Sequence, residues 1–237
     1  MGVILEVCVD TPAGLAAAVE GGADRIELCS GLALGGLTPS AGFMRMAAGC
    51  GVPVMAMIRP RDGDFVWSEA EIALMEADIA TARAAGLAGV VLGALLPDGA
   101  LDVPGLQRLT RVAAGMDLTL HRCFDLVPDM AVALEMAVAL GFRRILTSGG
   151  AMTAPEGAVR IGALVGQSAG RISIMPGAGV TAQTAGLLIG HGVREVHGSC
   201  SASVTMRGPG VDLGFGAAVG RRTDAAVVRA VKRAMEA

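Results

Sequence analysis

The sequence predicts a single α/β domain, a (β/α)8 TIM barrel that spans residues 1–237. Three observations support this prediction. Short aliphatic and β-branched runs alternate eight times with alanine-rich stretches, which is typical of parallel βαβ units. Most alanine-rich stretches are closed by a glycine, where helices commonly end. The length of 237 residues is close to the roughly 250 residues of a usual barrel.

Each repeat supplies one expected strand and one expected helix. The strands are expected at residues 3–9, 25–29, 53–59, 89–95, 117–123, 143–149, 171–177 and 194–200. The helices are expected at about 12–20, 39–49, 68–85, 103–114, 128–140, 153–167, 181–189 and 223–236. An open, doubly wound sheet is the alternative, but no GxGxxG turn follows the first strand. Eight units therefore favour a closed barrel.

Composition narrows the class of protein. Hydrophobic residues make up 53% of the chain and charged residues 17%, so we expect a large and mainly aliphatic core. The net charge of −3 argues against a nucleic-acid partner, and no apolar run of membrane-spanning length occurs. The chain begins directly with a strand that Glu6 and Asp10 interrupt, so no signal peptide is expected. Five irregularly spaced cysteines then indicate reduced thiols and a cytoplasmic protein.

Strand parity predicts which side chains point to the barrel axis. Side chains alternate along a strand, and the aliphatic positions of the first strand suit the helix-facing side. The opposite parity sends polar residues inward, where they are costly unless paired or hydrated. We therefore expect them near the open mouth at the carboxyl ends of the strands, where barrel enzymes carry their chemistry.

A set of ionisable residues is predicted to meet at this mouth. Two carboxylates with histidine and arginine are suited to acid–base chemistry on a small anionic molecule. The alternative is a network of ion pairs that closes the barrel, in which Arg59 and Glu27 would be an obvious pair. The candidate catalytic residues are Glu6, Glu27, Arg59, His121, Asp125 and His197.

Glycine-containing turns follow the last three strands. In many barrels, loops after the seventh and eighth strands bind phosphate through backbone N–H groups. A glycine-rich turn can also simply end a strand, and that alternative stays open. The candidate substrate-binding residues are Thr147, Ser148, Gly177, Gly179, Gly198 and Ser199.

Cys8 and Cys29 are the candidate metal ligands. Both are inward-facing by parity and lie near the ends of adjacent strands, which are about 4.8 Å apart in a sheet. Two thiolates at that separation could bind Cu(I), because soft sulfur ligands select this ion. Alternatively, both cysteines pack as small buried apolar residues.

Several motifs carry a resemblance to a known family. They are LEVCVD, GGADRIELCS, LGGLTPS, MIRPRDGDF, HRCFD, LTSG, IMPGAGV and GVREVHGS, which together cover roughly residues 3–200. With these motifs the chain resembles the CutC-type copper homeostasis proteins. The resemblance implies the same barrel, Cys8 and Cys29 as copper ligands, a cytoplasmic location and a homo-oligomer, often a homodimer. The chain departs from the family pattern at Cys123, Ala178 and Cys200.

Two functions from different classes remain. The first is a cytoplasmic copper homeostasis protein that binds Cu(I) through cysteine thiolates. The second is a barrel enzyme that uses the Glu/His/Arg cluster on a phosphorylated or carboxylated small molecule. The family resemblance supports the first function, and the chemistry of the inward-facing residues favours the second.

Overall fold

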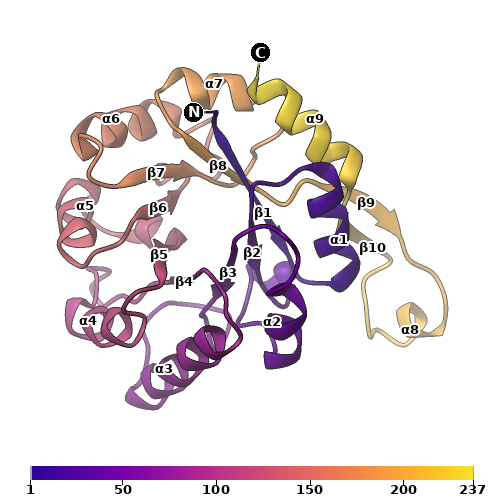
Figure 1. Cartoon of the computed structure of the whole chain (residues 1–237), viewed down its shortest axis with the longest axis horizontal. Coiled ribbons are helices and arrows are strands. Elements are labelled where there is room, and N and C mark those ends of the chain that lie inside the picture. Colours follow the sequence, from indigo (N-terminus) through magenta and orange to yellow (C-terminus); the bar gives the residue numbers. More distant parts are fainter. Residues whose placement is uncertain (1, 237) are drawn as a thin grey trace.

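The computed structural model of the chain describes residues 2–236, and it confirms the predicted (β/α)8 barrel. Eight short parallel strands surround the axis, with the helices outside them (Figure 1). The strands are β1 (Ile4–Val9), β2 (Arg25–Leu28), β3 (Val54–Met57), β4 (Gly89–Leu92), β5 (Asp117–Leu120), β6 (Arg144–Thr147), β7 (Ser173–Pro176) and β8 (Glu195–Gly198). All eight fall inside the ranges that the sequence predicts.

Most of the longer helices begin next to a side chain that caps the first turn. Longer helices are α1 (Pro12–Gly21), α2 (Ala41–Ala47), α3 (Glu69–Ala84), α4 (Val103–Val112), α5 (Met130–Ala139), α6 (Ala158–Ser168), α7 (Ala185–Gly190) and α9 (Ala225–Met235). The 3-10 turns η1 (Leu32–Leu34) and η2 (Arg122–Leu126) follow β2 and β5. Ser68 and Glu71 form a reciprocal capping box at the start of α3. The N-cap side chains of α1, α2, α4, α5 and α9 are Thr11, Ser40, Asp102, Asp129 and Asp224, whereas α6 and α7 begin without such a cap.

Strand register places the polar residues at matching heights. The hydrogen-bonded order is β7-β6-β5-β4-β3-β2-β1-β8, and β7 also contacts β8, which closes the barrel. On either side of β1, Glu6 is level with His197 of β8, and Cys8 is level with Glu27 of β2. The first two strands and the last strand therefore gather the ionisable side chains.

Apolar side chains fill both faces of the barrel wall. Leu5, Val7 and Val9 are fully buried between β1 and the helices, as their parity predicts. Inside the barrel, a small apolar cluster is formed by Cys29, Met55, Met57 and Val91. The inner face is therefore apolar near β3 and β4 and polar near β1, β2 and β8.

A hairpin that the sequence analysis did not predict follows β8. Strands β9 (Ser201–Thr205) and β10 (Val219–Thr223) pair antiparallel, and α8 (Pro209–Asp212) lies at the tip. We call residues 201–223 the arm; it projects from one side of the barrel before α9 returns to pack beside α1 (Figure 1). Among the described residues, no helix has the length and apolar character needed to cross a membrane.

Candidate functional site

A cavity of about 550 Å³ opens at the carboxyl ends of the strands. It is where the sequence places the site, and eight of the predicted site residues line it. These residues are Cys8, Glu27, Arg59, His121, Gly179, Gly198, Ser199 and His197. The other predicted residues, Glu6, Cys29, Asp125, Thr147, Ser148 and Gly177, are not among the lining residues.

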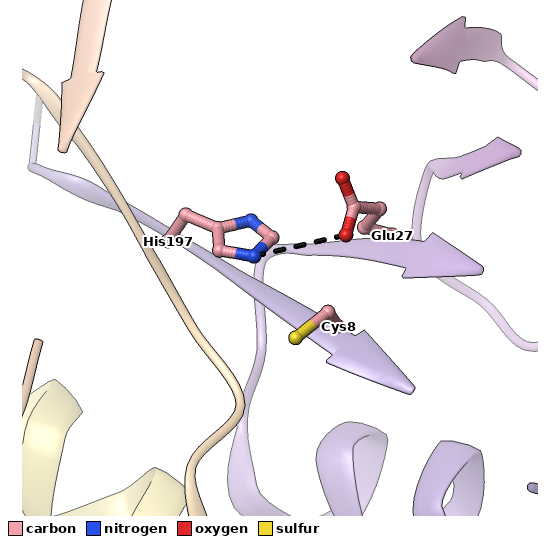
Figure 2. A group of neighbouring side chains, drawn as sticks. All are labelled: Cys8, Glu27 and His197. Atoms are coloured by element: carbon pink, nitrogen blue, oxygen red, sulfur yellow. Dashed lines mark ion pairs between the residues drawn. The ribbon is translucent and has the colours of Figure 1, made fainter. Parts of the chain in front are cut away.

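Cys8, Glu27 and His197 form one group of possible metal ligands. Each offers one ligand atom, these atoms lie within 4.8 Å of one another, and all three residues are buried. Figure 2 shows His197 and Glu27 pointing toward each other, with the Cys8 sulfur on the neighbouring strand β1. Nε2 of His197 is 3.7 Å from Oε2 of Glu27. The described residues offer no other group of this kind.

Glu6 lies below the cavity and holds His197 in place. Its Oε1 is 2.8 Å from Nδ1 of His197, and its Oε2 accepts a hydrogen bond from Nε of Arg25. Arg25 also donates to Glu195, which accepts a 3.0 Å hydrogen bond from Nε of Arg144. All five side chains are buried. Glu6 is thus part of an ion network across the barrel interior, and not part of the cavity wall.

The surroundings of His197 determine its charge. Burial alone would lower the pKa of His197, but Glu27, Cys8 and Glu6 together raise that pKa well above its usual value. Burial raises the pKa of Glu27, and the charge of His197 opposes this rise. The acidic neighbours of His197 therefore favour the protonated form of its imidazole.

His121 offers the opposite case, a neutral imidazole. Burial and then the positive charge of Arg59 lower its pKa to about 3. Its Nδ1 accepts a 3.2 Å hydrogen bond from the backbone N–H of Cys123, so the ring proton lies on Nε2. Nε2 has no partner among the described residues, and His121 lines the cavity. The Nε2–H group of His121 is therefore a buried hydrogen-bond donor without an acceptor, on a residue that lines the cavity.

Arg59 and Glu27, the obvious pair of the alternative ion-pair network, do not form an ion pair in the described structure. Nη1 of Arg59 donates to the carbonyl oxygens of Leu34 at 2.8 Å and Gly36 at 3.2 Å, and Nη2 donates to that of Gly63 at 3.2 Å. The reason is that the loop after β2 folds over the end of β3 and presents carbonyl groups to the guanidinium. Arg59 thus joins two loops at the mouth, while Oε1 of Glu27 stays without a hydrogen-bond partner.

Asp125 holds a loop and does not reach the cavity. Its carboxylate accepts hydrogen bonds from the backbone N–H groups of Ser148 and Gly150, and from the hydroxyl groups of Thr147 and Ser148. Arg122 donates to the same carboxylate from Nε at 2.8 Å. Thr147 and Ser148 therefore use their hydroxyl groups within the protein, which leaves them little capacity for a ligand.

Cys29 lies behind Glu27 in the apolar cluster. It is fully buried, and its Sγ donates a 3.5 Å hydrogen bond to Oε2 of Glu27. Burial and the charge of Glu27 raise the pKa of this thiol well above its usual value. The sulfur of Cys8, in contrast, belongs to the ligand group at the cavity. The pairing of Cys8 with Cys29 around one metal ion stays a prediction.

The structure adds two arginines that the sequence analysis did not select, Arg122 and Arg221. Arg122 follows His121 directly, and strand parity would point it away from the axis. The 3-10 turn η2 ends the alternation at this point and brings Arg122 to the rim. Arg221 belongs to β10 in the arm, where no strand was expected. Both arginines give the rim a positive charge.

Together, the fold and the cavity define a TIM-barrel protein with a buried polar site at the carboxyl ends of its strands. The CutC family model matches residues 3–202, so this chain belongs to the CutC family. CutC family proteins of Sinorhizobium medicae and Rhizobium meliloti are each 58% identical to it, over 237 and 235 residues. The alignments cover 99% and 98% of this chain, and 97% and 96% of the relatives.

A solved structure of the family agrees with the barrel. The CutC protein of Streptococcus agalactiae, described as a copper homeostasis protein, superposes with a TM-score of 0.80 at 35% sequence identity. The superposition covers 83% of this chain and 98% of that chain. The family model ends at residue 202, so nearly the whole arm lies beyond the match.

Proposed function

We propose that this chain is a copper homeostasis protein that binds Cu(I) through cysteine thiolates at the mouth of its barrel. The observation that carries the proposal is the group of ligand atoms from Cys8, Glu27 and His197. Thiolate and imidazole are ligands that copper ions accept, and thiolate in particular selects Cu(I). Copper handling is also the role given in the description of the Streptococcus agalactiae relative.

The donor set fits a soft ion held by sulfur and nitrogen. Cys8 would supply the thiolate and His197 the imidazole, which must lose its proton before it can bind a metal. Glu27 faces both groups and can accept such a proton. Cys29 is the second predicted thiolate, and its hydrogen bond to Glu27 keeps it beside the group.

Copper binding is tested by titrating the reduced protein with Cu(I) against a competing chelator. We expect one ion per chain in the wild type and a strong loss of affinity in Cys8→Ser and His197→Asn. Cys50→Ser is the matched control, because Cys50 is a free, half-buried thiol that does not line the cavity. Wild-type stoichiometry and affinity in Cys8→Ser would contradict the proposal. An unchanged Cys29→Ser variant would remove Cys29 from the ligand set.

A second candidate function is acid–base catalysis on a phosphorylated or carboxylated small molecule. The observation that favours it is a pair of buried, unpartnered polar atoms, Oε1 of Glu27 and Nε2 of His121, on residues that line one cavity. Glu27 can take up a proton, and His121 can donate a hydrogen bond to a ligand oxygen. Buried polar atoms without partners are costly, and a polar ligand would remove that cost.

The catalytic candidate is tested by a thermal-shift screen of a metabolite library. Hits are then measured with Glu27→Gln and Arg59→Met, two substitutions that roughly keep side-chain volume. We expect weaker binding or lost turnover in both variants. If both variants lose stability while every hit still binds as in the wild type, the cluster is structural and the catalytic candidate is wrong. Cys8→Ser separates the two candidates, because only copper binding requires this thiol.

We also propose that the chain works in the cytoplasm as a homodimer. All five cysteines are free, in keeping with a reducing compartment. Leu213, Phe215 and Val219 of the arm are 73%, 86% and 63% exposed, which is unusual for large apolar side chains. Light scattering should give a mass well above the 23.7 kDa of one chain. A constant monomer mass over a wide concentration range would contradict the dimer.

A further inference from the structure

We propose that the barrel mouth contains a subsite for a phosphoryl group, formed by residues 178–180, Ser199 and Arg221 of the arm. The ligand of the cavity is then a small phosphorylated molecule with a polar group at its other end. This inference deepens the catalytic candidate and rests on it, since it names the class of ligand for the same cavity.

The loop after β7 offers backbone donors that the protein itself does not use. Ala178, Gly179 and Val180 all line the cavity. Within residues 2–236, their three N–H groups donate no hydrogen bond to the protein. The amides on either side are satisfied: Gly177 N–H binds the carbonyl oxygen of Thr147, and Thr181 N–H binds Oγ1 of Thr184. Consecutive backbone N–H groups in a turn can bind an anion, and these three have no acceptor within the described protein.

Arg221 supplies a fixed positive charge at the same rim. Its Nε donates to Oγ of Ser201 at 2.9 Å, and its Nη2 donates to the carbonyl oxygen of Ser201 at 2.7 Å. The Oγ atom of Ser201 lies 2.8 Å from the Oγ atom of Ser199, and Ser199 lines the cavity. No described residue accepts from Nη1 of Arg221. The guanidinium is thus oriented by the arm, with one donor group left for a ligand.

The deeper part of the cavity points independently to a ligand. His121 is 3% exposed and Glu27 is also 3% exposed, and each has an unpartnered polar atom. Glu27 is the one carboxylate among the described residues that line the cavity, whereas Arg59, Arg122 and Arg221 are all cations. A ligand with an anionic end at the rim and a carbonyl or hydroxyl group near His121 would satisfy both sets of donors.

The number of donors favours a phosphoryl group over a carboxylate. Residues 178–180, Ser199 and Arg221 all line the cavity. They offer three backbone N–H groups, one hydroxyl group and the Nη1 group of the arginine. A phosphoryl group has three terminal oxygen atoms and close to two negative charges, so it can use more of these donors than a planar carboxylate can. Arg221 lies beyond residue 202, where the family model ends, but within the part of the chain that the 58% identical relatives cover.

The test is a titration of the full-length, ¹⁵N-labelled chain with inorganic phosphate, followed by NMR. We expect saturable shifts of the amide signals of residues 178–180. Arg221→Met should raise the dissociation constant by about tenfold or more, because a charge-assisted hydrogen bond is lost. Arg222→Met is the matched control, since Arg222 is the next residue of β10, contacts Sδ of Met206 and does not line the cavity. Its dissociation constant should equal that of the wild type.

Each alternative outcome is decisive. Absence of saturable shifts at residues 178–180, or equal weakening by Arg221→Met and Arg222→Met, overturns the subsite. Acetate that binds more tightly than phosphate overturns the phosphoryl assignment. If Arg221→Met unfolds the arm, Ser199→Ala replaces it, and unchanged phosphate binding in that variant counts against the subsite. Glu27→Gln removes a negative charge from the cavity, so this variant should bind phosphate at least as tightly as the wild type. Phosphate binding therefore tests the subsite separately from acid–base catalysis, which requires the Glu27 carboxylate.

Discussion

Nδ1 of His197 lies 2.8 Å from Oε1 of Glu6, a carboxylate whose side chain has no exposed surface. The contact joins β8 to β1, whose register places the two residues level with each other. It fixes the imidazole plane and leaves Nε2 directed to Glu27 at the cavity. Arg25 also binds Glu6, so the ion network below the cavity holds His197 in position.

The first prediction concerns Arg25 as the centre of this network. Arg25 is 5% exposed and binds both Glu6 and Glu195. Arg25→Met removes the cation between these two buried carboxylates and leaves Glu6 with only His197 and Glu195 with only Arg144. We expect the free energy of unfolding to fall by about 3–5 kcal/mol, as for other broken buried pairs. Denaturant unfolding measures this loss. Arg171→Met, which removes an exposed ion pair with Glu135, is the control, and its free energy of unfolding should change little. Equal losses of stability in the two variants would contradict the prediction.

The second prediction concerns the pH dependence of stability. Burial raises the pKa of Glu6, but Arg25 and His197 more than offset this and lower it from 4.5 to about 2. A carboxyl group with a lower pKa in the folded chain stabilises that chain above its unfolded pKa, and the stabilisation is lost as the pH falls through the folded pKa. The free energy of unfolding should therefore fall between pH 4.5 and about 2, by roughly 3 kcal/mol from this group.

Urea unfolding at a series of pH values tests this dependence. The Glu6→Gln variant has no titrating group at this position, so its stability should change less over the same pH interval. Parallel pH profiles for the wild type and Glu6→Gln would show that Glu6 does not carry the effect.

The sequence predicts the barrel well because its signals are local and repeated. Strand parity also places Glu27, His121 and His197 correctly on one inner face, since side chains alternate regularly within a strand. The same parity rule applied to residue 25 would have put Arg25 on the inner face, beside Glu27, and so indicated the ion network.

What the sequence could not predict depends on loops. Arg122 reaches the rim because a 3-10 turn interrupts the alternation directly after β5. Arg59 binds carbonyl groups because a distant loop folds over it, which no pattern around residue 59 reveals. The arm carries Arg221 on a strand of mixed polarity with exposed faces, and such a strand has little hydrophobic periodicity. The local sequence pattern therefore does not predict the conformations of the loops or the hydrogen-bond partners of the side chains that they contact.

The third prediction concerns thiol reactivity. Cys29 and Cys123 are fully buried, whereas Cys50 is half-buried. Burial raises the pKa of the Cys123 thiol, with a further contribution from Asp125, and burial with Glu27 raises that of Cys29. Iodoacetamide should therefore modify Cys50 first in the folded protein and leave Cys29 and Cys123 unmodified.

Peptide mass spectrometry after timed quenching measures this order of modification. In denaturant, all five thiols should react at similar rates, which provides the control. Rapid modification of Cys29 or Cys123 in the native protein would mean that the barrel opens on the labelling timescale, and the prediction would be wrong.

The last prediction concerns the packing that fixes His121. A Cβ atom added at Gly93 would collide with Sγ of Cys123 and lie 2.5 Å from Cε1 of His121. The carbonyl oxygen of Gly93 also accepts a 2.8 Å hydrogen bond from Nε1 of Trp67, so the backbone has little freedom to move away. Gly93→Ala should cost about 1–3 kcal/mol of unfolding free energy, as overpacking of a core commonly does, and it should displace the His121 ring.

Denaturant unfolding and NMR of the imidazole test this prediction together. In the wild type, burial and Arg59 lower the pKa of His121 to about 3, so the ring should stay neutral near neutral pH with its proton on Nε2. Gly166→Ala is the matched control, because Gly166 lies in α6 with open space around it, and alanine should stabilise the helix there by about 0.5–1 kcal/mol. If Gly93→Ala keeps wild-type stability and unmoved His121 signals, the ring is not fixed by this contact. His121 could then no longer be argued to be a preorganised donor to a ligand.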